Sequence, residues 1–282
     1  MTTSFGRRLS DALAAKGHLC VGIDPHRNLL DAWGLEPTAE GVRTFGLTVI
    51  DALADVVAVC KPQSAFFEEY GAWGIAALED VLAHAKDAGL LTILDVKRGD
   101  IGSTMAGYAR AYLGDGPLAA DAITLSPYLG LGSLDPAFEM AREKDRGAFV
   151  LALTSNPQGP EVQHASTAHG SVAGDIIAGV DRRNREAGEK DHLGSFGLVI
   201  GATIGNALDT LDIDLGGITT PILAPGLGAQ GADTQQVRRV FGPACRNVIA
   251  STSRAVLSAG PEVKSLRQSA LHANDSLVDL FA

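Results

Sequence analysis

The chain of 282 residues is 46% hydrophobic and 20% charged, with a slightly positive mean hydropathy of +0.13. This composition can supply a large core and excludes disorder over most of the chain. Acidic residues outnumber basic ones by 33 to 23, and the formal net charge of −10 argues against nucleic acid or an anionic membrane as a partner.

The N-terminal segment lacks the pattern of a secretory signal. Arg7 and Arg8 are followed by Ser10 and Asp11, where a signal peptide would have an apolar core. No apolar run in the chain reaches about 18 residues, the length needed to span a membrane. We therefore expect a cytoplasmic protein with no membrane association.

Three cysteines, Cys20, Cys60 and Cys245, lie far apart in the sequence and are odd in number. This spacing predicts neither a disulfide framework nor a CxxC metal site. We expect all three to be buried free thiols.

Eight short apolar runs follow one another along the chain, and each ends in small or polar residues. Runs this continuous are typical of parallel strands that are buried on both faces. The predicted strands are 18–25, 55–63, 90–97, 121–128, 148–156, 197–203, 221–228 and 247–254.

The segments between these strands have helical periodicity, most plainly residues 68–90, which end near Gly89. Eight strand and helix units in about 240 residues are typical of an α/β fold, the (β/α)₈ TIM barrel. We expect a single catalytic domain over residues 1–282, with a helix in residues 1–17 that caps the N-terminal face of the barrel.

Two connections are longer than the others. The first is residues 26–41, where we expect His26 to be a surface or packing residue rather than a substrate contact. The second is residues 155–194, for which we predict an active-site loop followed by an extended helix near 166–188. The remaining histidines lack a metal-ligand spacing such as HExxH, so we predict no metal site.

Charged residues lie at the C-terminal ends of the predicted strands, where the active site of this fold is built. Because strand side chains alternate between faces, Asp95 and Lys97 should point together into the barrel mouth. The same alternation directs Lys61 and Asp24 there, and Asp100 follows in a glycine-containing turn. Charges of this kind are costly to bury and cluster at functional sites, although ion pairs that only satisfy one another remain an alternative.

A lysine held between carboxylates stays charged, which suits a proton donor or charge stabiliser better than an amine nucleophile.

Anion recognition is predicted at the last two strands. PGLGAQG (225–231) is a glycine-rich loop after the seventh strand, and Arg254 ends the eighth. Barrels of this type frequently bind phosphate in these two loops.

The segment LDVKRGDIGSTMAGYA (94–109) resembles the signature of the orotidine 5′-phosphate decarboxylase family, Asp-x-Lys-x-x-Asp followed by Ile. The Asp-x-Lys-x-x-Asp core also occurs in a wider group of phosphate-binding barrels. More specific motifs lie at the other strand ends, in the family's order and over essentially the whole chain: VGIDP (21–25), KPQSAFFE (61–68), SPYLG (126–130), LTSNPQG (153–159), APGLGAQG (224–231) and STSRAV (251–256). The residues of these motifs resemble those of the longer bacterial subgroup of the family, which includes actinobacterial enzymes.

The resemblance implies decarboxylation of orotidine 5′-monophosphate to uridine 5′-monophosphate and CO₂ in de novo pyrimidine biosynthesis, without a cofactor. Lys97 would protonate C6 of the pyrimidine, and Asp95 would lie near the departing carboxylate. Lys61 would connect Asp95 to the ribose hydroxyls, which Asp24 would also contact.

The resemblance also implies a homodimer with composite active sites, in which Asp100 reaches into the neighbouring site together with Ile101 and Thr104. Four further substrate-binding residues follow from it: Ser155 at the pyrimidine ring, Pro225, Gln230 between base and phosphate, and Arg254 at the phosphate.

Three other functions remain open. A Mg²⁺-dependent enzyme of the same barrel group would need carboxylate ligands, but Lys61 occupies a position where one would be expected. A Schiff-base aldolase would need Lys97 as a neutral amine. A non-catalytic nucleotide-phosphate binder would keep the anion site without a use for the charged array.

Overall fold

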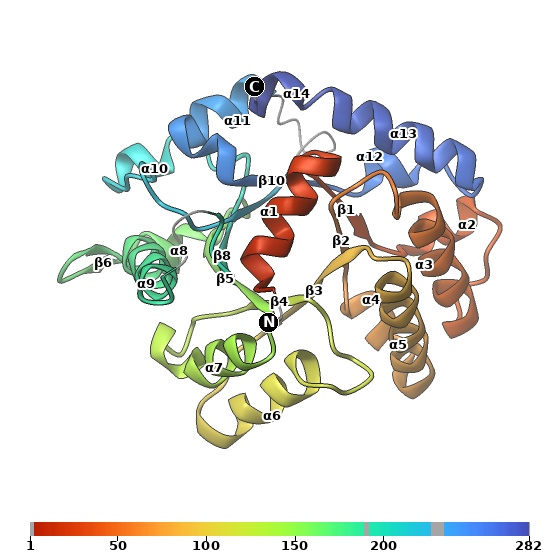
Figure 1. Cartoon of the computed structure of the whole chain (residues 1–282), viewed down its shortest axis with the longest axis horizontal. Helices are drawn as coiled ribbons and strands as arrows, with labels where there is room; N and C mark the ends of the chain where they lie inside the picture. Colours follow the sequence, from red (N-terminus) through yellow and green to blue (C-terminus); the bar gives the residue numbers. More distant parts are fainter. Residues whose placement is uncertain (1–2, 189–191, 227–233, 282) are drawn as a thin grey trace.

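In the computed structural model, which describes residues 3–188, 192–226 and 234–281, eight parallel strands close into a barrel (Figure 1). Pairing of the last strand with the first completes the closure. The α/β architecture is the predicted (β/α)₈ TIM barrel, and each predicted run overlaps one of its strands. In order around the barrel these are β1 Leu19–Ile23, β2 Val59–Pro62, β3 Leu91–Arg98, β4 Ala122–Leu125, β5 Gly147–Leu153, β8 Phe196–Ile200, β9 Ile222–Pro225 and β10 Val248–Thr252.

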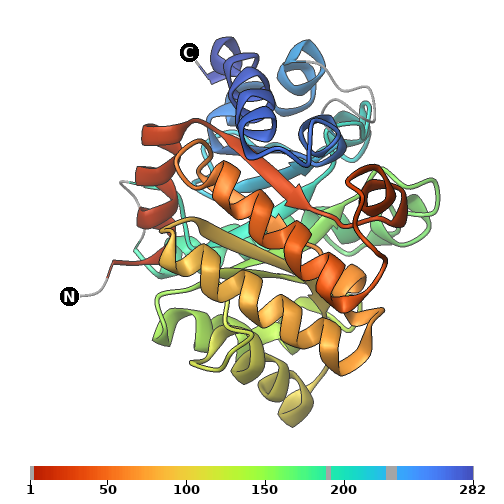
Figure 2. The same cartoon turned by 90° about the vertical axis from the view of Figure 1, so that its right-hand side faces the viewer.

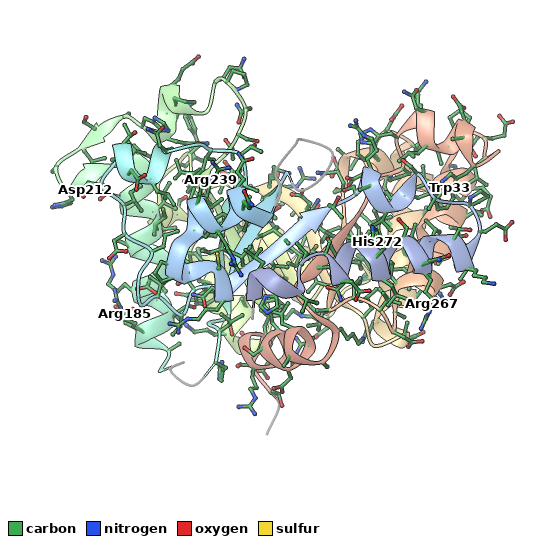
Figure 3. All side chains as sticks on the ribbon, turned by 90° about the horizontal axis from the view of Figure 1, so that it is seen from above. Trp33, Arg185, Asp212, Arg239, Arg267 and His272 are labelled. Atoms are coloured by element: carbon green, nitrogen blue, oxygen red, sulfur yellow. The ribbon has the colours of Figure 1, made fainter. Side chains whose placement is uncertain are left out.

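Helices surround the barrel (Figure 1), and most of the core lies between them and the strands. Figure 3 shows α13, which carries Arg267 and His272, on the outside of the barrel. The helices of this outer layer and its short 3₁₀ turns are α2 Arg27–Ala32, α3 Ala39–Leu53, α4 Ala65–Glu68, α5 Gly71–Asp87, α6 Gly102–Leu113, η1 Leu131–Leu134, α7 Asp135–Glu143, α9 Val172–Glu186, α10 Ala207–Thr210, α11 Thr234–Phe241, η2 Gly242–Asn247, α12 Arg254–Leu257, α13 Val263–Asp275 and α14 Val278–Phe281.

The N-terminal helix α1, Phe5–Lys16, lies across one end of the barrel (Figure 2). Its apolar residues Phe5, Leu9 and Leu13 recur every four positions and therefore share one face. All three are buried in the barrel's interior cluster, where the ring of Phe5 meets that of Phe149 edge-on at 6.2 Å. Each such burial contributes about 1.5–3 kcal/mol. The predicted cap at the N-terminal face is confirmed.

The long connection after β5 contains more structure than predicted. It holds the one-turn helix α8, Pro160–Gln163, and then a hairpin of β6, Ser166–Thr167, and β7, Gly170–Ser171. The helix expected from residue 166 begins at residue 172, so this part of the prediction was wrong. The reason is local: Gly170 has a φ of +137°, and the Ser171 hydroxyl caps α9 by accepting a hydrogen bond from the Gly174 N–H.

The three cysteines are buried and unpaired, as predicted. Burial raises the pKa of Cys20 to about 12, so this thiol is unreactive despite its position inside the barrel. No helix in the described part of the chain combines the length and apolar composition needed to cross a bilayer.

Candidate active site

Three charged side chains meet at the C-terminal mouth of the barrel. Lys61 at the end of β2 places its Nζ 3.1 Å from Oδ2 of Asp95, and Lys97 places its Nζ 2.6 Å from Oδ1 of the same carboxylate. The side chains of Lys61 and Asp95 are only 8% exposed, whereas that of Lys97 is 46% exposed. The predicted convergence of these three residues is confirmed, and Lys97 is the member open to a bound molecule.

A bulge in β3 shapes this array. The pairing of β3 with β4 shifts between Leu94 and Arg98, where three residues of β3 lie opposite the single residue Thr124. Lys97, at the end of the bulge, has a φ of +44°, a left-handed conformation that is uncommon for a residue with a side chain. Strain of this kind persists only where the surrounding structure enforces it, and it clusters at functional sites.

Two neutral side chains that the sequence analysis missed complete the surroundings of Asp95. Thr124 Oγ1 donates to Oδ1 at 2.7 Å, and Gln63 Nε2 donates to Oδ2 at 2.8 Å. Each carboxylate oxygen thus accepts one bond from an ammonium and one from a neutral donor. A sequence signal was present, because Thr124 is the polar residue of the apolar run AITL and Gln63 follows Lys61 at strand spacing.

Asp95 and Lys61 each stabilise the charged form of the other. Burial alone would raise the pKa of Asp95, but the nearby ammoniums of Lys61 and Lys97 and their hydrogen bonds hold it well below its usual range. Burial alone would lower the pKa of Lys61, yet the carboxylates of Asp95 and Asp24 raise it above its ordinary value. Both groups therefore stay ionised at neutral pH.

Two adjoining cavities open at this mouth and share Lys61 and Pro225 in their walls. The first, of about 290 Å³, contains the charged array and the apolar side chains of Leu151, Val199 and Leu223. The second, of about 230 Å³, lies toward the ends of β1 and β10. Together they can accept an elongated polar molecule with one end beside the array.

Four predicted substrate-binding residues line these cavities. Ser155 lies in the first, Asp24 and Arg254 lie in the second, and Pro225 belongs to both. Oδ1 of Asp24 is buried and has no hydrogen-bond partner within the described residues. Gln230 lies outside the described residues.

His26 also lines the second cavity, while its ring packs against Phe66 with ring centroids 4.2 Å apart. The ring contact is a packing contact, but the position of His26 in the cavity wall does not separate the expected packing role from a substrate contact. Among residues 3–188, 192–226 and 234–281, no cluster of three His, Cys, Asp or Glu side chains is arranged to hold a metal ion.

The remaining predicted site residues, Asp100, Ile101 and Thr104, do not join the array within one chain. They lie between the end of β3 and the first turn of α6, outside the lining of both cavities. Ile101 is 62% exposed, and Thr104 is exposed as well. Asp100 accepts a hydrogen bond from the Ile101 N–H and makes no ion pair in the part of the chain that the structure describes.

Comparison with known proteins agrees with this geometry. Residues 17–269 match the model of the family described as "Orotidine 5'-phosphate decarboxylase / HUMPS family". A relative named orotidine 5′-phosphate decarboxylase from Streptomyces coelicolor is 54% identical over 268 residues, which is 94% of each chain. A relative of the same name from Salinispora arenicola is 52% identical over 95% of this chain and 94% of its own.

Solved structures give the same result. A crystal structure from Streptomyces avermitilis superimposes with a TM-score of 0.93 and 52% identity, covering 100% of this chain and 97% of the other. The structure of Leishmania donovani OMP decarboxylase superimposes with a TM-score of 0.78 and 28% identity, covering 99% of each chain. With a match over most of its length and relatives above half identity, the chain belongs to the orotidine 5′-phosphate decarboxylase / HUMPS family.

Proposed function

We propose that this chain decarboxylates orotidine 5′-monophosphate to uridine 5′-monophosphate and CO₂, as a cytoplasmic enzyme of de novo pyrimidine biosynthesis. The observation that carries the proposal is the array of Lys61, Asp95 and Lys97 in a cavity at the barrel mouth. The relatives at 52–54% identity bear the name of this activity. We further propose that residues 1–282 act as one catalytic domain.

Loss of CO₂ leaves negative charge at C6 of the pyrimidine, with no adjacent carbonyl placed to delocalise it. Lys97 is suited to meet this charge, because its ammonium faces the cavity while Asp95 anchors it at 2.6 Å. A fixed cation stabilises the developing carbanion and can then protonate it, which combines electrostatic preorganisation with general acid catalysis. This assignment requires no cofactor.

Asp95 would lie beside the carboxylate that leaves. Since the ammoniums keep Asp95 ionised, it would repel the substrate carboxylate more strongly than neutral CO₂. The apolar side chains of Leu151, Val199 and Leu223 in the same cavity also favour the neutral product over the anion. Both effects act in the direction of decarboxylation.

The second cavity suits the ribose phosphate. The unpartnered Oδ1 of Asp24 is an acceptor for a ribose hydroxyl. Lys61 lines the second cavity as well as the first, and it forms the ion pair with Asp95. Arg254 can donate to the phosphate, with Gln230 between phosphate and base and Ser155 at the base. Binding energy from the remote phosphate would then hold the base in line with Lys97.

We infer that two copies of the chain form the working enzyme, with Asp100 completing the array of the opposite subunit and Ile101 and Thr104 beside it. Large apolar side chains stand exposed on the same face of the barrel: Ile101 at 62%, Tyr128 at 77% and Leu129 at 53%. They follow the neighbouring strands β3 and β4, and a surface of this kind is typically covered by a partner.

Mixing two inactive variants tests this arrangement. A hybrid of Lys97→Ala and Asp100→Ala subunits would contain one intact site if Asp100 acts across the interface, and none if it acts within its own chain. After subunit exchange in equal mixture, we expect about a quarter of the wild-type activity. A mixture as inactive as its components would contradict the composite site.

The overall function is tested by following the absorbance of orotidine 5′-monophosphate with purified protein in excess EDTA. Decay to uridine 5′-monophosphate would support the proposal. Activity lost on EDTA treatment would favour a metal-dependent member of the barrel group, and a substrate adduct trapped by borohydride would favour a Schiff-base enzyme. Tight nucleotide binding without turnover would identify a binding protein.

A further inference from the structure

Thr124 on β4 joins Asp95 and Lys97 of β3 through one hydroxyl group. Its Oγ1 accepts a hydrogen bond from the Lys97 backbone N–H at 2.9 Å and donates one to Asp95 Oδ1 at 2.7 Å. Because a hydroxyl has a single proton, these two bonds fix its orientation. Thr124 is 1% exposed, so water cannot readily replace either bond.

The hydroxyl also compensates for the bulge in β3. Three residues of β3 face only Thr124, and the left-handed backbone at Lys97 departs from ordinary strand geometry. A buried backbone N–H without a partner is strongly unfavourable, so the bulge needs an acceptor at this place. The Thr124 oxygen supplies it, and in doing so holds the backbone from which the Lys97 side chain extends.

We propose that Thr124 is a positioning residue, whose hydroxyl locks Asp95 and Lys97 to one another and thereby holds the Lys97 ammonium in place over the cavity. The inference rests on the proposed function. The Lys97 side chain is long, flexible and nearly half exposed, so its carboxylate partner and its backbone must provide the order that packing does not. Gln63 contacts the other oxygen of Asp95 and cannot perform this role.

The chain contains a matched control for this idea. Thr92 on β3 is also buried, and its hydroxyl makes the same two kinds of bond: it accepts from the Asp121 N–H and donates to the Asp121 carboxylate. It lies near the N-terminal end of β3, outside the lining of both cavities. Thr92→Val therefore measures the structural cost of losing such a hydroxyl away from the site.

The test compares Thr124→Val, Thr124→Ser and Thr92→Val in steady-state turnover and in binding of uridine 5′-monophosphate. A small displacement of a catalytic group can lower the rate by about 100-fold, so we expect kcat of Thr124→Val to fall by about that factor. Its KM and its product affinity should change little. Thr124→Ser keeps the hydroxyl and should recover most of the rate, while Thr92→Val should keep wild-type kcat.

A second readout does not depend on activity. In spectra of ¹³C-lysine-labelled protein, with the Lys97 signal identified by its loss in Lys97→Ala, an anchored side chain gives two distinct Hε resonances. In Thr124→Val the two Hε resonances of Lys97 should merge toward the chemical shift of a mobile lysine. In Thr92→Val they should stay distinct and unchanged. Should Thr124→Val fail to fold, Thr124→Cys, with a weaker donor, takes its place in both comparisons.

The inference is overturned if Thr124→Val keeps wild-type kcat and Lys97 signals, or if Thr124→Ser is as slow as the valine variant. Equal loss of rate in Thr92→Val would also overturn it, because the effect would then be merely structural. A wild-type chain that does not decarboxylate orotidine 5′-monophosphate would refute the proposed function instead. The Lys97 signals would then decide by themselves whether Thr124 anchors this side chain.

Discussion

Replacing Lys61 by methionine should lower the free energy of unfolding, because the buried carboxylate of Asp95 loses its buried cation. Methionine keeps a similar unbranched stem without the charge. Nζ of Lys61 lies 3.1 Å from Oδ2 of Asp95, and both side chains are 8% exposed. Removing one partner of a buried ion pair lowers the free energy of unfolding by about 3–5 kcal/mol. Since Asp95 retains Lys97, Gln63 and Thr124, we expect the lower end, about 3 kcal/mol.

A double-mutant cycle separates this pair from general damage to the core. Asp95→Asn alone should also be destabilising, because Lys61 is left as a buried cation with a weaker set of partners. The double variant Lys61→Met/Asp95→Asn removes both charges, and it should cost less than the sum of the single variants by about 1–3 kcal/mol. Urea unfolding at neutral pH, followed by circular dichroism with the m-values compared, measures all four free energies. Additive costs would refute the reasoning.

The effect of Asp95→Asn should also depend on pH. The pKa of Asp95 is lowered in the folded protein, so the stability that its charge contributes is present above the unfolded pKa of about 3.9. It is lost as the pH falls from there toward the folded pKa. The difference in unfolding free energy between wild type and Asp95→Asn should therefore be constant near neutrality and shrink below about pH 4. A difference that grows in acid would contradict this sign.

Three further predictions concern the site and the fold, and the third has Arg7→Ala as its control. Lys97→Ala should lower kcat by about 1,000-fold or more while uridine 5′-monophosphate still binds, and turnover within about tenfold of wild type would exclude the proposed role. Arg254→Ala should weaken binding of uridine 5′-monophosphate by about tenfold or more without affecting uridine, and an unchanged nucleotide affinity would remove Arg254 from the phosphate site. Leu9→Ala should lower the unfolding free energy by about 2–5 kcal/mol, whereas Arg7→Ala on the exposed face should have little effect; equal costs would show that α1 does not close the barrel.

The architecture followed from local patterns. Strands buried on both faces are continuous apolar runs, and helices that cover them repeat their apolar residues with helical spacing, so the order of elements could be predicted along the chain. The helix predicted in residues 1–17 is present as well, and the spacing of Phe5, Leu9 and Leu13 gives it one apolar face. Strand alternation predicted that Lys61, Asp95 and Lys97 meet at one mouth, and they do, but in the structure the β3 bulge rather than regular alternation directs Lys97.

Errors arose where structure depends on a few local bonds. The helix was expected from residue 166, but residues 166–171, STAHGS, hold a single apolar side chain, and Gly170 and the Ser171 cap start the helix at residue 172. A glycine with positive φ interrupts the helix here, because a left-handed residue cannot continue a right-handed helix.

By itself, then, the sequence determined the barrel, its N-terminal cap and the set of charged strand ends, because hydrophobic periodicity and strand alternation act over a few residues. Only the tertiary structure decided which donors surround Asp95, how the β3 bulge directs Lys97 and that Asp100 stays outside the cavities of its own chain. These features depend on the register between strands far apart in the sequence, which closure of the barrel sets and no local pattern encodes.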